Sequence, residues 1–238
     1  MSKEISIITP NYNSESFIEE TAQSLLAQSF KEWEWIIVDD GSDDNSLIYL
    51  SELEFITENI HLIRRNREPK GPSTCRNIGL EHAQGKYIIF LDADDFLADH
   101  CLENRYKYMR KNSHLDFAVF KMQWYNDNTK TKGKIVNNYL NSYQSYLQEF
   151  IEGRPPWSTL CPIWNKELLH ELGGFDEDLI RSTDPDLHTR ALLIKGIQYE
   201  VPANVIVDCF YRYIPDFEEK YHVNIPFKII GTYTFYRK

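Results

Sequence analysis

Short apolar runs alternate with longer amphipathic spans through the first hundred residues. The runs lie at residues 5–9 (ISIIT), 35–38 (WIIV), 60–63 (IHLI) and 87–91 (YIIFL). Their length and their β-branched residues predict buried strands. The spans between them predict helices, at residues 14–28, about 45–58 and 72–85. Strands joined by helical spans of this length run parallel, so the sequence predicts an α/β fold with a mostly parallel central sheet flanked by helices.

The second half of the chain is less regular. Residues 116–122 predict another strand, and residues 126–138 predict a hairpin or a loop. Further helices are expected at about 143–152 and 166–172. One more is expected to begin at Asp184, with Asp184 as its cap and Pro185 in its first position. No linker or internal repeat divides the chain, so we expect a single domain over residues 1–238.

Charge and cysteine content exclude several classes of protein. The net charge is -10, which gives no basic footprint for nucleic acid. The four cysteines form no CxxC pair, and their number is too small for a disulfide scaffold. There is no signal-peptide h-region and no run of the ~18 apolar residues that a spanning helix needs. We therefore expect a cytoplasmic protein. Residues 225–238 are aromatic and indicate a docking tail, or the point where a longer chain was cut.

Acidic clusters follow two of the predicted strands directly. Asp92, Asp94 and Asp95 follow the fourth strand, and such a cluster repels itself unless a cation or hydrogen-bond donors are present. Mg²⁺ and Mn²⁺ prefer one or two carboxylates together with phosphate oxygens. Asp39 and Asp40 follow the second strand and could accept hydrogen bonds from a nucleobase or ribose. A solvated acidic turn and a tight Asp-Gly-Ser turn are the alternatives.

A basic segment precedes the third predicted helix, and only Glu68 opposes it locally. Its members are Arg64, Arg65, Arg67, Lys70 and Arg76. In an acidic chain this segment suits a diphosphate, although charge runs more often face water.

Two isolated residues are further candidates for the site. A carboxylate held at a helix start, as Asp184 is expected to be, could act as a general base, or simply cap the helix. Tyr12 could stack on a base or pack locally.

Six runs, taken in order, resemble the family 2 glycosyltransferases, which have the GT-A fold. They are residues 7–13 (IITPNYN), 38–42 (VDDGS), 75–79 (CRNIG), 90–95 (FLDADD), 173–176 (GGFD) and 183–190 (TDPDLHTR). The resemblance covers about residues 5–212. It implies a nucleotide-sugar-binding half at about 1–112 and an acceptor-binding and catalytic-base half at about 113–238.

The resemblance also implies roles for the residues that match its nucleotide-binding motifs. Pro10, Tyr12 and Asp40 would lie near the base, with Tyr12 stacked on it. Asp39 would support the same loop, and Asp92 would lie near the ribose.

Three more residues are assigned to the reacting centre in the same way. Asp94 would bind a divalent metal, Mn²⁺ or Mg²⁺. Arg76 would lie close to the diphosphate, and Asp184 would be the catalytic base.

The implied activity is inverting transfer of a sugar from a nucleotide-diphospho-sugar to a hydroxyl. By family habit the donor is a UDP-sugar, with GDP- and TDP-sugars left open. The acceptor would be a saccharide or lipid-linked saccharide in surface polysaccharide or glycoconjugate synthesis. The protein would then work in the cytoplasm, in peripheral contact with the inner face of the membrane.

Three other functions are alternatives for these residues. Thr183 stands where the family usually has Glu, which leaves open a catalytically impaired sugar-nucleotide-binding module. A sugar nucleotidyltransferase needs a Gly-rich phosphate loop, which is missing after Ile8. A haloacid-dehalogenase-like phosphatase needs Thr or Val where Phe96 stands.

Overall fold

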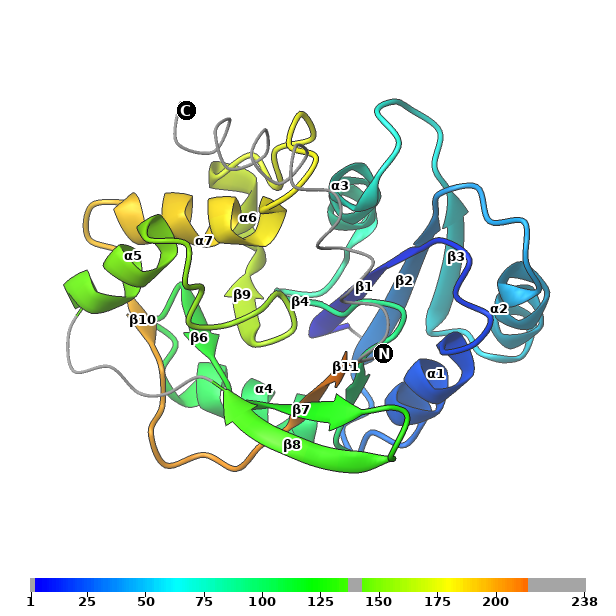
Figure 1. Ribbon diagram of the computed structural model, residues 1–238, viewed down its shortest axis with the longest axis horizontal. Coiled ribbons are helices and arrows are strands. Elements are labelled where there is room, and N and C mark those ends of the chain that lie inside the picture. Colours follow the sequence, from blue (N-terminus) through cyan, green and yellow to red (C-terminus); the bar gives the residue numbers. More distant parts are fainter. Residues whose placement is uncertain (1–2, 137–142, 214–238) are drawn as a thin grey trace.

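The computed structural model describes residues 3–136 and 143–213 (Figure 1). The predicted tail at 225–238, and residues 137 and 138 of the predicted hairpin or loop, lie outside the described residues. The helices are α1 (Ile18–Leu26), α2 (Ser46–Ile56), α3 (Pro72–His82), α4 (Cys101–Lys111), α5 (Tyr143–Ile151), α6 (Lys166–Glu171) and α7 (Thr183–Leu193).

A seven-stranded sheet forms the centre of the molecule, in the order β10-β6-β9-β4-β1-β2-β3. Its strands are β1 (Ile5–Asn11), β2 (Trp33–Asp39), β3 (Ile60–Arg64), β4 (Tyr87–Phe90), β6 (Phe117–Val119), β9 (Pro162–Asn165) and β10 (Tyr199–Glu200). The pairs β3–β2, β2–β1, β1–β4 and β6–β10 are parallel, whereas β9 pairs antiparallel to both β4 and β6. The predicted α/β fold with a mostly parallel sheet is confirmed.

The central strands are buried because helices pack against the sheet. Every residue of β2 and β4 is buried, which the continuous apolar runs predict for residues 35–38 and 87–90. Helix α3 comes especially close to β1: a Cβ built on Gly79 would lie 2.4 Å from Cγ2 of Ile8. This close packing places the start of α3 beside the end of β1, where the first loop begins.

A second sheet has the order β5-β11-β7-β8 and lies below the first in Figure 1. Its strands are β5 (Phe96–Leu97), β7 (Met122–Asn126), β8 (Thr131–Val136) and β11 (Cys209–Tyr213). The hairpin predicted after residue 126 is present as the turn between β7 and β8.

The single strand predicted at 116–122 is wrong, because the chain changes sheets within it. Phe120 still donates its N–H to the carbonyl of Cys161, the residue before β9 of the central sheet, whereas the Lys121 carbonyl already accepts from the N–H of Asp208, the residue before β11 of the second sheet. Residues 117–120 and Met122 are all buried in one core, which is why they resemble a single strand in the sequence.

The start of α7 also differs from the prediction. Ser182, with a φ of 60°, is the residue before the helix, and Thr183 is its first residue. The Asp186 N–H donates to the Ser182 carbonyl, 3.1 Å away, which closes the first turn. Asp184 and Pro185 therefore lie inside that turn, and Asp184 is not the cap.

The four cysteines are buried thiols.

Among the helices of residues 3–136 and 143–213, none has the length and apolar character that a membrane span requires.

Candidate active site

A cleft of about 440 Å³ opens where β1, β2 and β4 end. Of the predicted site residues, all except Asp39 and Asp184 line it: Pro10, Tyr12, Asp40, Arg76, Asp92 and Asp94. The lining also includes six residues that were not predicted: Asn11, Asn13, Ser14, Phe17, Pro72 and Ala93. The carboxyl ends of adjacent parallel strands meet at one sheet edge, which is why distant segments of sequence converge here.

Asp39 lies beneath the cleft and shapes its wall. Its carboxylate accepts hydrogen bonds from the Gly41 N–H at 3.0 Å and from the Ser42 N–H at 3.2 Å. The Asn11 amide donates to the same carboxylate at 2.9 Å, so this aspartate joins the loops after β1 and β2. This contact fits the expected supporting role of Asp39.

The predicted basic segment is largely paired with acids from other parts of the chain. The Arg65 Nε lies 2.5 Å from Oδ1 of Asp40. Arg67 pairs with Glu81 and with Glu177, each at 2.9 Å. The segment is therefore less open to an anionic ligand than its local sequence indicates.

Tyr12 is 53% exposed at the mouth of the cleft. The Lys70 Nζ lies 3.8 Å from the centre of its ring. A flat ligand that stacks on this face of the ring would have to displace the lysine, which is held there by a cation–π contact.

Arg76 links α3 to the acidic loop. Its side chain is 6% exposed, and its Nη2 lies 2.5 Å from Oδ1 of Asp92. The guanidinium also lies over the ring of Phe175 at 5.1 Å. The packing fixes Arg76 where it offsets part of the negative charge in the cleft.

Asp94 is an exposed residue on the side of the cleft, but the protein surrounds its carboxyl group from behind. This burial, followed by repulsion from Asp92, raises the pKa of Asp94 to about 6. A carboxyl group held in this way gains from a cation at its open side.

The carboxylates in the cleft could hold Mg²⁺ or Mn²⁺ only if a bound phosphate supplied further oxygen atoms. No cluster of three or more His, Cys, Asp or Glu residues that could hold a metal occurs in residues 3–136 and 143–213. The carboxylates of Asp92 and Asp94 line the cleft together, and hard divalent ions accept one or two carboxylates when phosphate oxygens complete the shell.

Asp184, in the first turn of α7, belongs to the second half of the chain and interacts with charged residues of the first half. Burial is the main cause that raises its pKa, and repulsion from Asp92 adds to it. Arg76 and a hydrogen bond from Thr159 act in the opposite direction. Asp184 is therefore close enough to interact with both Arg76 and Asp92.

Asp186, two residues further on, serves α7 itself. Its buried carboxylate lies 2.8 Å from Arg190, which in turn donates to the carbonyls of Leu172 and Gly174. This pair ties α7 to the Gly173-Gly174 turn.

Sequence reasoning missed Tyr211 on β11. Burial raises its pKa, and the further causes are Asp95, Asp94, Asp92 and Asp184 in that order. Its phenol thus interacts electrostatically with acids of both halves. No nearby motif marks it, since its relation to these acids comes only from the pairing of β11 with β7 and β5.

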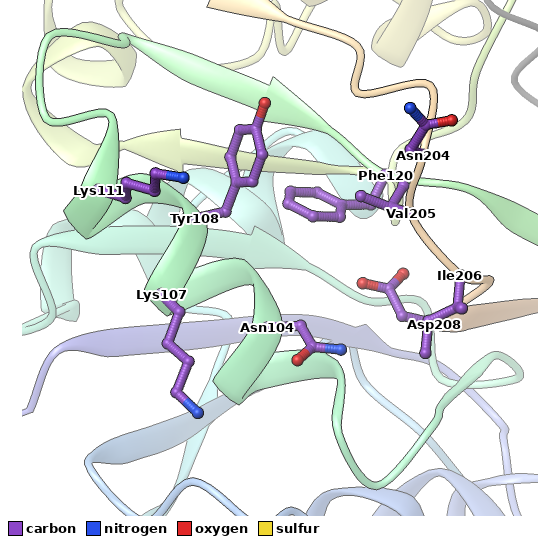
Figure 2. Close-up of a pocket in the computed structure, with 9 residues that line it drawn as sticks. All are labelled: Asn104, Lys107, Tyr108, Lys111, Phe120, Asn204, Val205, Ile206 and Asp208. Atoms are coloured by element: carbon purple, nitrogen blue, oxygen red, sulfur yellow. The ribbon is translucent and has the colours of Figure 1, made fainter.

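A second cleft, of about 400 Å³, lies between α4 and residues 204–208 (Figure 2). Its polar groups are mainly bonded to other side chains. Lys107 pairs with Glu103, the Tyr108 hydroxyl donates to Glu200, and Asp208 pairs with Arg105. It offers no cluster of acids comparable to the first cleft.

The sequence of this chain is similar to those of known glycosyltransferases. The sequence model described as Glycosyl transferase family 2 matches residues 6–165. The putative teichuronic acid biosynthesis glycosyltransferase TuaG of Bacillus subtilis is 43% identical over 109 residues, which are 46% of this chain and 43% of TuaG. The Escherichia coli enzyme UDP-Glc:alpha-D-GlcNAc-diphosphoundecaprenol beta-1,3-glucosyltransferase WfgD is 35% identical over 144 residues, which are 60% of this chain and 55% of WfgD. The chain thus spans about half the length of these relatives.

Solved structures share the fold. S. aureus TarS 1-349, in complex with UDP-GlcNAc, superposes with a TM-score of 0.71 at 23% identity, over 88% of this chain and 58% of that one. The mannosyltransferase PcManGT from Pyrobaculum calidifontis, with GDP-Man and Mn²⁺, gives 0.64 at 20% identity, over 89% and 57%. The fold of the described residues is therefore of the GT-A type, as the sequence predicts.

Proposed function

This chain belongs to glycosyl transferase family 2, and from that premise we propose that it transfers a sugar from a nucleotide-diphospho-sugar to a hydroxyl acceptor. One observation carries the proposal. The acids that follow β4 and the buried Arg76 line one cleft, and Asp184 from the second half interacts electrostatically with Arg76 and Asp92. Donor binding would fall to residues 1–112, and acceptor binding and base catalysis to residues 113–238, within a single domain.

We propose a UDP-sugar as donor. The base would stack on Tyr12 after Lys70 moves aside, with Pro10 and Asp40 beside it and Asp39 holding the loop. Asp92 would bind the ribose. The UDP-GlcNAc complex of TarS supports this choice, and PcManGT, crystallised with GDP-Man, keeps GDP-sugars as the competing donor.

Arg76 and Asp94 would act on the diphosphate. Arg76 would donate to its oxygens, since a guanidinium matches phosphate geometry. Asp94 would hold Mn²⁺ or Mg²⁺, with Asp92 nearby. When bound, such an ion supplies charge stabilisation for the leaving nucleoside diphosphate.

Asp184 would be the general base. Its raised pKa makes it a better proton acceptor than an exposed aspartate. It would take the proton of the acceptor hydroxyl while that oxygen bonds to the anomeric carbon. The bond from this carbon to the diphosphate oxygen breaks on the opposite side, and its electron pair leaves with the nucleotide. In-line displacement inverts the anomeric configuration.

The acceptor would be a saccharide or a lipid-linked saccharide of a surface polysaccharide. Support comes from the relatives: the name of TuaG places it in teichuronic acid biosynthesis, and that of WfgD gives it a diphosphoundecaprenol-linked acceptor. Work on such an acceptor would bring the protein to the inner face of the membrane.

Thr183 favours one second candidate, a sugar-nucleotide-binding module with impaired catalysis. Thr183 is buried at the first position of α7, where the family usually has Glu. Such a module would bind the donor as proposed but turn it over poorly, so binding and turnover must be measured separately.

The test begins with thermal shift of the protein with UDP, GDP and TDP, with and without Mn²⁺. Release of UDP from UDP-sugars is then measured with saccharide acceptors. Asp94→Asn should abolish the Mn²⁺-dependent part of UDP binding. The exposed Asp99 provides the control Asp99→Asn. Binding without UDP release would favour the module, and absence of any nucleotide binding would refute both functions.

A further inference from the structure

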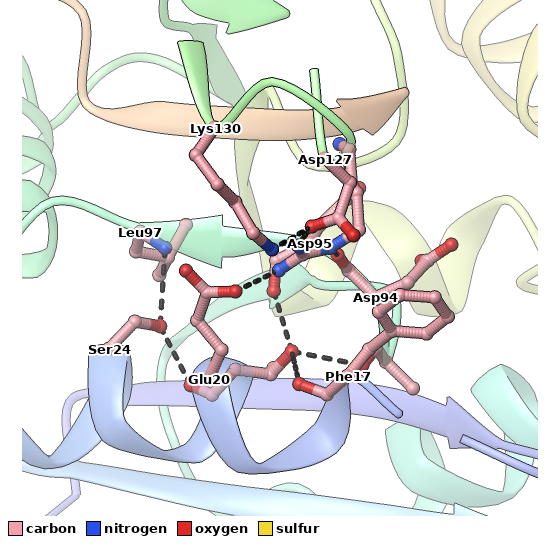
Figure 3. A network of polar contacts seen from close by, with 11 residues as sticks. Phe17, Glu20, Ser24, Asp94, Asp95, Leu97, Asp127 and Lys130 are labelled. Atoms are coloured by element: carbon pink, nitrogen blue, oxygen red, sulfur yellow. Dashed lines mark hydrogen bonds and ion pairs between the residues drawn. The ribbon is translucent and has the colours of Figure 1, made fainter. Parts of the chain in front are cut away.

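Arg212 is a buried cation that holds several segments together. It lies on β11, and its side chain is 1% exposed. Its Nη2 lies 2.5 Å from Glu20 on α1, and its Nη1 pairs with Asp127 in the turn between β7 and β8. Figure 3 shows Glu20, Asp127, Asp94 and Asp95 within one network of polar contacts. A charge buried this deeply is tolerated because acids and aromatic rings surround it.

The same residue bonds directly to the acidic loop. Its Nε donates to the Asp94 carbonyl at 2.7 Å, and its backbone N–H donates to Oδ1 of Asp95 at 2.8 Å. One residue therefore fixes both the main chain of Asp94 and the side chain of the next aspartate.

The other carbonyls of the loop are also occupied. The Asp95 N–H donates to the Asp92 carbonyl at 3.1 Å. The Thr21 hydroxyl lies 2.9 Å from the Ala93 carbonyl and 2.8 Å from the Asp95 carbonyl. With Arg212 on Asp94, the carbonyls of Asp92 and Asp94 each have their own donor, and those of Ala93 and Asp95 share the single Thr21 hydroxyl proton. The loop is thus held from α1 and from β11, and it presents the carboxylates of Asp92 and Asp94 to the cleft.

We propose that Arg212 is a positioning residue for the metal carboxylate. It holds the 92–95 loop in the conformation in which Asp94 faces the diphosphate site. The inference rests on the proposed function, because it takes Asp94 as the metal ligand. Groups that orient a metal ligand from behind typically change metal affinity by about 10–100-fold when altered.

Arg212→Lys tests the role with little change in charge. A lysine has a single nitrogen and cannot bond Glu20, Asp127 and the Asp94 carbonyl in the fork geometry of arginine. Arg105→Lys is the matched control. Arg105 is fully buried, and its hydrogen bonds go to Asp208 at 2.7 Å and to the Leu160 carbonyl at 2.8 Å instead of to the 92–95 loop.

The measurement is Mn²⁺ affinity in the presence of UDP, from the free Mn²⁺ signal in electron paramagnetic resonance. It is paired with calorimetry of UDP binding in EDTA and with urea unfolding. Arg212→Lys should weaken Mn²⁺ binding by about 10–100-fold and weaken metal-free UDP binding much less, because Arg76 still holds Asp92. Arg105→Lys should leave both unchanged. If Arg212→Lys does not fold, the charge-balanced variant Arg212→Gln with Asp127→Asn takes its place, with the same expectation.

The outcomes separate this inference from the function beneath it. Parental Mn²⁺ affinity in the Arg212 variant would overturn the positioning role and leave the function intact. Equal loss of Mn²⁺ affinity in the Arg212 and Arg105 variants, in step with stability, would show that Arg212 is merely structural. A parent protein whose UDP binding ignores Mn²⁺ would refute the metal role of Asp94, and the inference would fall with it.

Discussion

Replacing Asp184 and Asp186 by asparagine, one at a time, should have opposite effects on turnover and stability. The two residues lie in the first turn of the same helix. Asp184 interacts with Arg76 and Asp92 at the cleft, whereas Asp186 is bonded to Arg190. We expect Asp184→Asn to lose turnover and keep its stability, and Asp186→Asn to do the reverse.

The magnitudes follow from these contacts. Loss of a general base typically costs about 10²–10⁴-fold in rate, or about 3–5 kcal/mol of activation free energy. The pKa of Asp184 is raised in the folded protein, so its ionised form costs stability at neutral pH. Asp184→Asn should therefore unfold at or above the parental temperature. Asp186→Asn weakens a charged hydrogen bond, worth about 1.5–3 kcal/mol, and should lower Tm by about 3–12 °C.

The assay is steady-state UDP release with acceptor at 20 °C, with UDP affinity and Tm measured on the same samples. In the parent, kcat should fall as the pH drops through the raised pKa of Asp184, because the base becomes protonated. Donor affinity should be nearly equal in all three proteins. The reasoning is refuted if Asp184→Asn turns over at the parental rate, or if Asp186→Asn is inactive at its parental stability.

Three further perturbations test other parts of the structure. Arg76→Ala should weaken UDP much more than uridine in calorimetry, and equal losses would make Arg76 structural. Burial lowers the pKa of His188 to about 3, so only the unfolded chain takes up its proton below a pH of about 6.5. Protonation of His188 in the unfolded chain should therefore lower the free energy of unfolding by about 2 kcal/mol from pH 7 to pH 5. Urea unfolding of His188→Phe should show a smaller decrease over the same pH range, and an equal decrease would contradict this origin. Gly174→Ala should lower Tm, because Gly174 has a φ of 70° and a Cβ there would lie 2.4 Å from Oδ1 of Asn77; an unchanged Tm would contradict the clash.

The strands of the first half were predictable because each is a compact apolar run. Their exact ends were not. Strand β2 begins at Trp33 and includes the buried Glu34, which reads as a polar boundary in the sequence. Its carboxylate accepts from Ser6 at 2.5 Å and from the Gln84 N–H at 2.6 Å. Such partners are known only once the sheet is assembled.

The cleft was predictable for a related reason, since polar residues at the ends of parallel strands must meet. Asp92 and Asp94 could be placed at this edge from their position after one apolar run. The pairing of the basic segment could not, because Arg67 bonds Glu177, which is distant in sequence. Arg212 was missed for the same reason: its contact with Glu20 spans 192 positions.

The pairing of β5 with β11 joins an early segment of the chain to a late one, so the metal site is completed late during translation. The 92–95 loop leaves the ribosome early, together with the strands β1, β2 and β4 that surround the cleft. Arg212 leaves it near the end of the described chain. Until then the loop is held by Thr21 and by the contact of Arg76 with Asp92, and it lacks the arginine that neutralises Glu20 and binds the Asp94 carbonyl. A nascent chain halted before β11 would carry the parallel strands but an incompletely held loop, so competence for the metal would arrive only with β11.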